Sequence, residues 1–226
     1  MTLQVLELFS GTGSVGKVCD QLGWDVVSVD MMLPATHRVD IMLFDYKQYP
    51  KDSFDIVWAS PPCTAYSRLQ QSWLGRKKKD GIIFTQETLD ALINEADCIV
   101  KKAQEIIEYF NPELWFLENP ATGKLKERDF MSDIPFYDVS YCMYSDWGYE
   151  KKTRIWTNKK EWNHLQCDKS GRCGNMIGKK HRVNVSKVGC GQQHNTEKDL
   201  KFLGRGTNRI DRYRIPEDLI FSLFMD

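Results

Sequence analysis

The chain has 226 residues, of which 42% are hydrophobic and 27% charged, and its 31 Lys and Arg residues balance 31 Asp and Glu residues. This composition fits one globular domain with a modest insertion and excludes collagen-like, mucin-like and wholly disordered chains. The apolar runs are far shorter than the roughly 18 residues of a membrane span, the start does not resemble a secretory signal, and the 7 cysteines lack the rhythm of a disulfide scaffold. We therefore expect an intracellular protein, cytoplasmic or nuclear, with reduced thiols and no contact with a membrane.

The first 60 residues alternate between segments typical of strands and of helices. An apolar run over residues 3–9 ends at a glycine turn, and the helix expected over 15–22 should stop at Gly23. Two more strands are expected over 24–30 and 54–59. Strands that alternate with helices predict a parallel sheet with right-handed crossovers, in which ligands bind at the carboxyl ends of the strands.

A long helix is expected over residues 89–110, where apolar residues recur at three- and four-residue spacing for about six turns. Asn111-Pro112 should end this helix, and a buried strand over 114–117 then leads into Glu118-Asn119-Pro120. The carboxyl ends of the four expected strands should therefore converge on one cleft.

The pattern changes after Pro135. Residues 137–144 and 153–157 are expected to form an antiparallel pair, whereas 159–208 lacks sustained periodicity. A short final helix should begin after Ile215-Pro216, because acidic residues occupy its first turn.

The balanced net charge hides a local asymmetry. Between Lys151 and Cys190, 11 Lys and Arg residues stand against two acidic residues, so the rest of the chain is net acidic. A basic block on an otherwise acidic protein predicts a polyanionic partner such as nucleic acid. A solvated lysine-rich face is the alternative interpretation.

The glycine turn after the first strand is a candidate cofactor site. Gly11, Gly13 and Gly16 follow the Gly-x-Gly-x-x-Gly pattern between a strand and a helix, and Asp30 closes the next strand. An acidic residue at that place can bind both ribose hydroxyls of an adenosine-containing cofactor, and Asp40-Ile41 can contact the adenine. The alternative is a glycine turn that serves packing alone.

The loop Ser60-Pro61-Pro62-Cys63 is a candidate catalytic loop. Two prolines stiffen the chain where it leaves a strand and hold one thiol at the cleft, where a thiolate would be a strong nucleophile. Glu118 ends another strand, expected across the same cleft, and can act as a proton donor. The alternatives are a buried structural cysteine and a carboxylate that braces a loop.

Four motifs together resemble the cytosine-5 DNA methyltransferases, most closely the compact phage- and virus-type members. They are Phe9-Ser10-Gly11-x-Gly13, Pro61-Pro62-Cys63, Glu118-Asn119-Pro120 and the basic strand 152–158, in that order. The resemblance covers residues 3–158 and the closing segment 213–216. It implies an α/β fold built on the Rossmann-like class I methyltransferase sheet, with a small irregular target-recognition insertion near the C-terminus. The domains expected from it are a catalytic domain over 1–158, a basic recognition region over 159–208, and a C-terminal helical segment over 209–226 that packs back on the catalytic domain.

The resemblance also implies residue roles. Cys63 would add to C6 of a cytosine flipped out of double-stranded DNA, Glu118 would hold and protonate N3, and Arg154 would contact the base oxygen or a nearby phosphate. The cofactor would be S-adenosyl-L-methionine, held by Phe9, Ser10, Gly11, Gly13, Asp30, Met31, Asp40, Ile41 and Pro61.

Two motif residues and one length depart from the family pattern. Thr64 stands where many members have glutamine, and Pro120 stands where valine is frequent. The region between Thr157 and the last helix is short for a target-recognition domain, which implies a short recognition site or relaxed specificity.

The segment after the nucleophile, Ser67 to Lys79, is basic and contains Trp73. In the resembled family the corresponding loop closes over DNA, and phosphate contacts suit these residues; a mobile surface loop is the alternative. The residues expected to bind DNA are Ser67, Arg68, Arg76, Lys77, Lys152, Lys179, Lys180 and Arg182. We expect a monomer.

A structural zinc site is also considered. The preferred ligands are Cys142, Cys167, Cys173 and His181, with Cys190 and His194 also available. Their spacing is not that of a regular zinc motif, but a small irregular segment is stabilised strongly by a metal. Reduced thiols without a metal remain the alternative.

Two other functions remain open at this point. The chain would then be a catalytically silent methyltransferase fold that binds DNA or a protein partner, or a C5 methylase of RNA or nucleotides. Intact Cys63, Glu118 and Arg154 argue against the silent fold.

Overall fold

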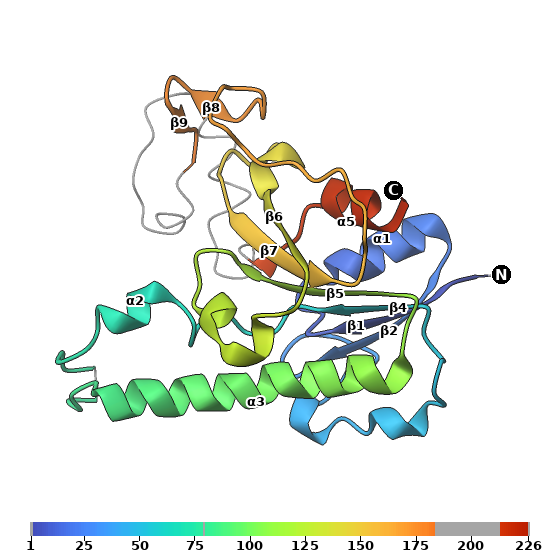
Figure 1. The fold of residues 1–226 in the computed structure, drawn as a ribbon, viewed down its shortest axis with the longest axis horizontal. Helices are drawn as coiled ribbons and strands as arrows, with labels where there is room; N and C mark the ends of the chain where they lie inside the picture. Colours follow the sequence, from blue (N-terminus) through green and yellow to red (C-terminus); the bar gives the residue numbers. More distant parts are fainter. Residues whose placement is uncertain (1, 79, 184–212, 226) are drawn as a thin grey trace.

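The computed structural model describes residues 2–78, 80–183 and 213–225, and its centre is a seven-stranded sheet (Figure 1). Along the sheet the strand order is β3-β2-β1-β4-β5-β7-β6. The first five strands of this order are parallel, and β7 runs antiparallel to both of its neighbours. The strands are β1 (Gln4–Leu8), β2 (Asp25–Asp30), β3 (His37–Arg38), β4 (Ile56–Ala59), β5 (Leu114–Pro120), β6 (Phe136–Ser140) and β7 (Lys152–Thr157).

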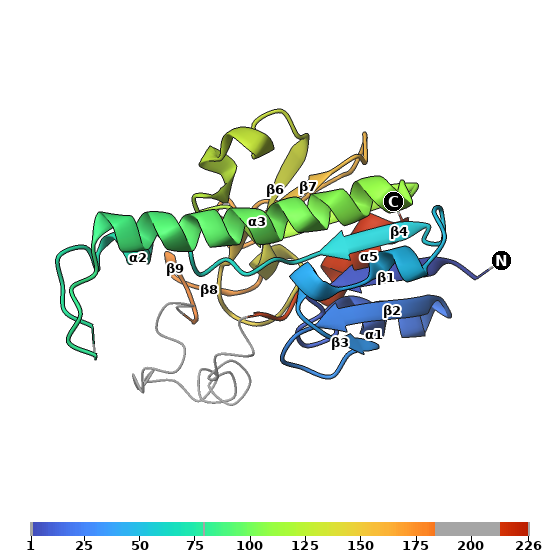
Figure 2. The same ribbon diagram turned by 90° about the horizontal axis from the view of Figure 1, so that it is seen from below.

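Helices cover both faces of the sheet, and Figures 1 and 2 show α3 along one face with α1 and α5 on the other. The helices are α1 (Ser14–Leu22), α2 (Arg68–Gln71), α3 (Gln86–Phe110) and α5 (Glu217–Met225). Short 3-10 turns are η1 (Ile41–Leu43), η2 (Tyr46–Gln48), η3 (Leu125–Glu127), η4 (Asp129–Met131) and η5 (Tyr141–Met143), and a separate hairpin pairs β8 (Met176–Ile177) with β9 (Lys180–His181). Among the described residues, no helix combines the length and the hydropathy needed to cross a bilayer.

Alternation along the central strands builds two cores. Leu6, Val57 and Leu117 pack with α3, whereas their neighbours Val5 and Phe116 pack on the other face with α1 and α5. This alternation follows from the two-residue period of a strand, and it buries both faces of the parallel part of the sheet.

The expected α/β architecture, a mainly parallel sheet with helices on both faces, is confirmed. The helix expected over 89–110 is part of α3, and α1 stops as expected at Gly23, whose φ of 71° is the left-handed conformation that a helix C-terminus favours. The last helix begins at Glu217, directly after Pro216.

One predicted strand is shorter than expected. We expected extended chain over 137–144, but β6 ends at Ser140 and Tyr141–Met143 forms η5. Tertiary contacts explain the turn, because the buried side chain of Asn175 donates a hydrogen bond of 2.8 Å to the carbonyl of Cys142. This contact comes from a residue 33 positions away, which periodicity cannot detect.

Candidate active site

The loop that carries Cys63 is held directly against the end of β5. Ser60 continues the β1–β4 pairing by donating its N–H to the carbonyl of Leu8 at 3.2 Å. The buried Asn119 side chain donates to the carbonyl of Pro61 at 2.9 Å. The Pro-Pro-Cys loop and the Glu-Asn-Pro segment therefore meet at the carboxyl ends of β4 and β5, as expected from the parallel sheet.

Cys63 is half-buried and carries a free thiol. Burial raises the pKa of the Cys63 thiol, the Glu118 carboxylate raises this pKa further, and the Lys151 ammonium opposes the shift. The structure thus brings Cys63 and Glu118 within electrostatic range of each other, together with a cation. Because the pKa of Cys63 is raised, the free protein holds a thiol and not a thiolate at neutral pH.

Glu118 is 6% exposed and is held by two side chains. The Tyr141 hydroxyl donates to Glu118 Oε1 at 3.0 Å, and Lys151 Nζ lies 3.6 Å from the same oxygen. Lys151 Nζ also lies 4.5 Å from the centroid of the Tyr141 ring. Burial, reinforced by the charge of Glu118, keeps the pKa of Tyr141 well above its ordinary value, so Tyr141 acts as a hydrogen-bond donor.

The structure does not bring Arg154 together with Cys63 and Glu118, contrary to expectation. Glu118 pairs in register with Ile155, so the side chain of Arg154, one residue away, points to the opposite face of the sheet. There its guanidinium donates two hydrogen bonds to Asp138, at 2.7 and 2.8 Å, and lies 3.5 Å from the ring centroid of Phe136.

Lys151, and not Arg154, is the cation beside Glu118. Sequence reasoning missed both Lys151 and Tyr141. The signal for Lys151 was present, since it belongs to the same basic run, three residues before Arg154. No sequence pattern pointed to a role for Tyr141, which was expected to be one residue of a strand over 137–144.

The glycine turn after β1 has a strained backbone. Gly11 and Gly13 have φ values of 53° and 66°, and Phe9, which is not a glycine, has a φ of 59°. A bulky residue in the left-handed region costs free energy and is concentrated at functional sites. The Ser10 hydroxyl is buried in this turn without a hydrogen-bond partner. An unpaired polar atom of this kind fits a turn that receives a polar ligand.

Glu7, on β1, fixes the start of the helix that follows the turn. It is 3% exposed, and its two carboxylate oxygens accept the backbone N–H groups of Val15 and Gly16 at 3.2 Å each, in the first turn of α1. Burial is the largest cause that raises the pKa of Glu7 from 4.5 to about 7. Sequence reasoning did not assign Glu7 a role.

Asp30 lies beside the turn, as expected, and fixes the chain around it. Its Oδ2 accepts the N–H of Gly11 at 2.9 Å, and its Oδ1 accepts those of Met32 and Leu33 at 2.8 and 2.7 Å. A carboxylate has about four acceptor positions, so these three bonds leave room for one further donor. Met31, the next residue along the chain, is 57% exposed.

Asp40 and Ile41, the two residues expected at the adenine, have local structural roles. Asp40 caps η1, because its Oδ1 accepts the N–H of Met42 at 2.9 Å. Ile41 is 5% exposed and packs into the core with residues of α3.

Comparison with known proteins decides the family. No family model matches the chain. A protein of Frog virus 3 (isolate Goorha) named "Probable DNA (cytosine-5)-methyltransferase" is 38% identical over 224 residues, which is 98% of this chain and 98% of that protein. The chain belongs to the DNA (cytosine-5)-methyltransferase family.

Solved methyltransferase structures are more distant from this family member. The Entamoeba histolytica methyltransferase EhMeth is 14% identical with a TM-score of 0.46, and the match covers 84% of this chain and 65% of that one. The S. pombe Dnmt2 methyltransferase is 14% identical with a TM-score of 0.44, and the match covers 90% of this chain and 66% of that one.

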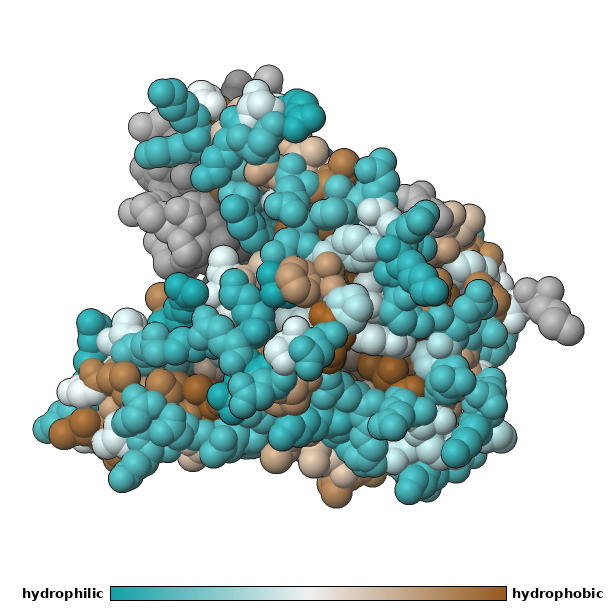
Figure 3. Space-filling model, viewed as in Figure 1, coloured by the Kyte–Doolittle hydropathy of each residue, from teal (hydrophilic) through white to brown (hydrophobic). Residues whose placement is uncertain are grey.

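In this methyltransferase family member, the segment after Cys63 projects from the body as α2 and a hairpin over 75–84 (Figures 1 and 2). Ser67 caps α2, Arg68 pairs loosely with Glu127 at 3.5 Å, and Arg76 and Lys77 are exposed. The segment is also apolar at its surface, and Figure 3 shows hydrophobic surface at this end of the molecule. Its exposed apolar side chains are Leu69, Trp73, Ile82 and Ile83, which are between 46% and 70% exposed.

The base of this segment is anchored in the core. The hydroxyl of the buried Tyr66 donates to Asp97 Oδ1 at 2.9 Å, and Arg128 bonds the other oxygen of Asp97 at 2.6 and 3.0 Å. Asp97 lies on α3 and is 6% exposed. The long helix therefore fixes the point at which the segment leaves the body, three residues after Cys63.

The remaining cations expected at DNA have different environments. Lys152, Lys179 and Lys180 are exposed. Arg182 is half-buried, and it donates to the Asn175 side chain at 2.8 Å, so it takes part in the structure of the segment.

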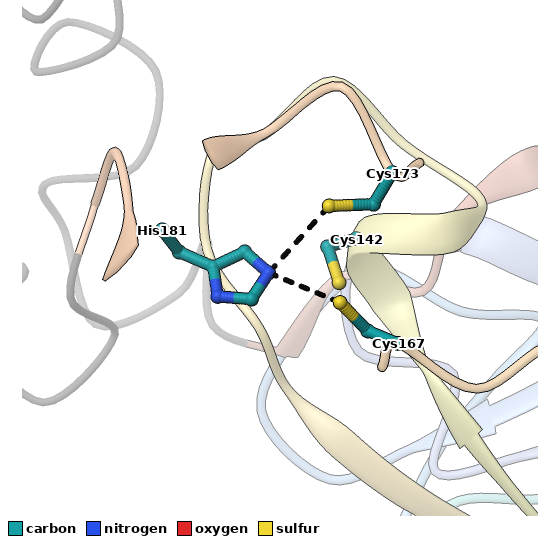
Figure 4. A group of neighbouring side chains, drawn as sticks. All are labelled: Cys142, Cys167, Cys173 and His181. Atoms are coloured by element: carbon teal, nitrogen blue, oxygen red, sulfur yellow. Dashed lines mark hydrogen bonds between the residues drawn. The ribbon is translucent and has the colours of Figure 1, made fainter. Parts of the chain in front are cut away.

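The four preferred metal ligands come together in space (Figure 4). Their ligand atoms all lie within 4.8 Å of one another. Burial raises the pKa of Cys142 and of Cys167, the two neighbouring thiols raise the pKa of Cys142 further, and burial lowers the pKa of His181. The other residues considered, Cys190 and His194, lie outside the described residues.

Proposed function

We propose that the protein transfers a methyl group from S-adenosyl-L-methionine to C5 of cytosine in double-stranded DNA, through a covalent bond between Cys63 and a flipped-out base. The observation that carries this proposal is the meeting of Cys63 and Glu118 at one end of the sheet, where the Asn119–Pro61 hydrogen bond locks their two segments together. Family membership supports the same reaction.

The cofactor would bind at the ends of β1 and β2. The left-handed backbone of Phe9, Gly11 and Gly13 opens the turn, the unpaired Ser10 hydroxyl offers a hydrogen bond, and the remaining acceptor position of Asp30 suits a ribose hydroxyl. S-adenosyl-L-methionine supplies an electrophilic methyl group there when it is bound.

Cys63 and Glu118 share the proton transfers on the base. The Cys63 thiol passes its proton to the Glu118 carboxylate, and the sulfur then adds to C6 of cytosine as Glu118 delivers that proton to N3. The addition breaks the conjugation of the ring and makes C5 nucleophilic. Once C5 carries the methyl group, a water molecule removes its proton, the C6–S bond breaks, and the N3 proton returns to Glu118.

Lys151 and Tyr141 position the acid. Both contact Oε1 of Glu118, so we assign the other oxygen, Oε2, to the cytosine N3 edge. The positive charge of Lys151 also lowers the pKa of Cys63 and stabilises the thiolate as it forms. Arg154 takes no part in holding Glu118, since its guanidinium binds Asp138 on the other face of the sheet.

DNA would contact the exposed cations on either side of the site. Arg76 and Lys77 on the projecting segment and Lys152, Lys179 and Lys180 beyond the sheet carry positive charge suited to phosphates. Extrusion of the base costs a few kcal/mol, which contacts in the pocket can offset.

Trapping on modified DNA tests the reaction. A duplex containing 5-fluorocytosine cannot lose fluorine after methyl transfer, so we expect a denaturation-stable protein–DNA adduct that requires S-adenosyl-L-methionine. Cys63→Ser should abolish the adduct while it retains cofactor binding, and Cys98→Ser, which alters an exposed cysteine of α3, should leave both unchanged. An adduct that survives Cys63→Ser would refute the proposed nucleophile.

Two further measurements define the substrate. Tritium transfer to duplex DNA, tRNA and dCMP in competition should favour the duplex, and preference for either of the others would identify an RNA or nucleotide methylase. Bisulfite sequencing of treated DNA would show the methylated positions, and cofactor binding without methylation of any substrate would identify a silent fold.

A further inference from the structure

The cluster of Cys142, Cys167, Cys173 and His181 has the dimensions of a tetrahedral metal site. His181 Nε2 lies 3.5 Å from Cys167 Sγ and 3.7 Å from Cys173 Sγ. A zinc ion with Zn–S bonds of about 2.3 Å and a Zn–N bond of about 2.05 Å requires S···N separations of about 3.6 Å and S···S separations of about 3.8 Å. Because all four ligand atoms already lie within 4.8 Å of one another, no pair needs to close by more than about 1.2 Å.

We propose that these four side chains bind one structural Zn²⁺ ion. Three thiolates and one imidazole in a tetrahedron are the donor set that selects zinc, and four protein ligands leave no open position for a substrate. Figure 4 shows His181 pointing its ring at the sulfurs from the far side of the cluster. Cys142 comes from η5, directly after the sheet strand β6, and His181 from β9, so the ion joins the turn after β6 to the β8–β9 hairpin.

The surroundings of the cluster hold the ligands before any ion arrives. The side-chain nitrogen of the buried Asn175 donates to the carbonyls of Cys142 and Cys173, at 2.8 and 2.9 Å. The N–H of Cys167 donates to the Ser140 hydroxyl at 3.1 Å. Hydrogen bonds that fix the backbone of ligand residues are typical of the outer shell of metal sites.

An ion can also reach the ligands from solvent. Cys142 and Cys173 line an open cleft of about 660 Å³, whose other walls include Trp147, Asn175 and Arg214. A site with fixed ligands and an access route meets the structural requirements for zinc binding.

The ion would connect the β8–β9 hairpin, whose exposed lysines are proposed to contact DNA, to Glu118, the proposed acid. The β8–β9 hairpin carries Lys180, and Cys142 directly follows Tyr141, the hydrogen-bond donor to Glu118. Loss of zinc would therefore loosen the exposed cations and disturb the Tyr141–Glu118 bond together. This consequence, unlike the metal site itself, rests on the proposed function.

Metal analysis of the full-length protein tests the site. We expect about one equivalent of zinc per chain in protein purified without chelators, with three sulfurs at about 2.3 Å and one nitrogen at about 2.0–2.1 Å in zinc X-ray absorption spectra. Because this spectrum is measured on the unaltered chain, it does not depend on whether a variant folds. A spectrum dominated by oxygen or nitrogen ligands, protein without zinc after reconstitution, or a disulfide between two of the cysteines would overturn the proposal.

Variants identify the ligands. Cys173→Ser and His181→Ala should lose at least tenfold in zinc affinity, whereas His181→Cys should retain zinc with a fourth sulfur in its spectrum. Cys98→Ser and Cys190→Ser are matched controls that should keep one equivalent, and loss of zinc in Cys190→Ser would assign the ion elsewhere. Cofactor binding and 5-fluorocytosine trapping by the same zinc-loaded protein report on the proposed methylation independently of its metal content.

Discussion

The ion pair between Glu118 and Lys151 makes the strongest quantitative prediction. Lys151 Nζ lies 3.6 Å from Glu118 Oε1, and the two side chains are only 16% and 8% exposed. At an effective dielectric constant of about 20, two unit charges at this distance attract by about 5 kcal/mol, and desolvation of both groups offsets part of that gain. Removal of one partner from a buried pair costs about 3–5 kcal/mol, because the other charge is left uncompensated.

A double-mutant cycle isolates this interaction. We expect Lys151→Met and Glu118→Gln each to lower the free energy of unfolding by about 3 kcal/mol, and the double variant to lose about 2 kcal/mol less than the sum of the two. The measurement is urea unfolding of the four proteins at one pH, with the slope against urea checked for constancy.

The Arg154–Asp138 pair supplies the control cycle. Its hydrogen bonds are shorter, but Asp138 is 34% exposed, so solvent screens the pair and its coupling should be smaller than that of Glu118 with Lys151. Stability losses for Lys151→Met and Glu118→Gln that add within about 0.5 kcal/mol would refute the ion pair as the device that holds Glu118.

Three other predictions follow from the same structure. Burial and the Glu118 charge raise the pKa of Cys63 above 9.0, so the rate of alkylation of Cys63 by iodoacetamide should still increase above pH 9. Glu118→Gln should move this pH–rate profile to lower pH. A shift to higher pH would contradict the assigned electrostatics. Glu7 has its pKa raised from 4.5 to about 7, so its contribution to stability is complete below about pH 4.5 and is lost as the pH rises through about 7, by about 3 kcal/mol in total. Unfolding free energies at pH 5 and pH 8 should show this loss, and Glu7→Gln should lack it. Tyr66→Phe removes a buried hydrogen bond to the charged Asp97 and should cost about 1.5–3 kcal/mol in urea unfolding, whereas a loss below about 0.5 kcal/mol would show that Asp97 does not anchor the segment after Cys63.

The spacing of apolar residues and the glycine and proline residues at helix ends were enough to predict the elements that position the site. The apolar spacing of α3, Gly23 after α1 and Pro216 before α5 are local signals, and each marked its element correctly. The parallel sheet then placed Cys63 and Glu118 at neighbouring strand ends, because parallel strands share one carboxyl edge.

Side-chain direction within the antiparallel part could not be predicted in the same way. A shift of one residue in the β5–β7 register exchanges the two faces of β7, and nothing local in the run from Lys151 to Arg154 sets that register. Arg154 was therefore expected at the base oxygen or a nearby phosphate, whereas its side chain binds Asp138 and Lys151 is the cation beside Glu118. Long-range hydrogen bonds such as those of Asn175 likewise leave no periodic trace in the sequence.

The described residues on either side of 184–212 are hydrogen-bonded to the body of this methyltransferase family member. Val183 donates its N–H to the carbonyl of Gly148 at 2.7 Å, and Ile215 donates to the Ser14 hydroxyl of α1 at 3.1 Å. The entropic cost of joining two fixed points of a protein by a chain rises only slowly with the number of residues between them. A change in the number of residues between these two contacts therefore costs little free energy, and the sheet that carries Cys63 and Glu118 keeps both contacts whatever that number is.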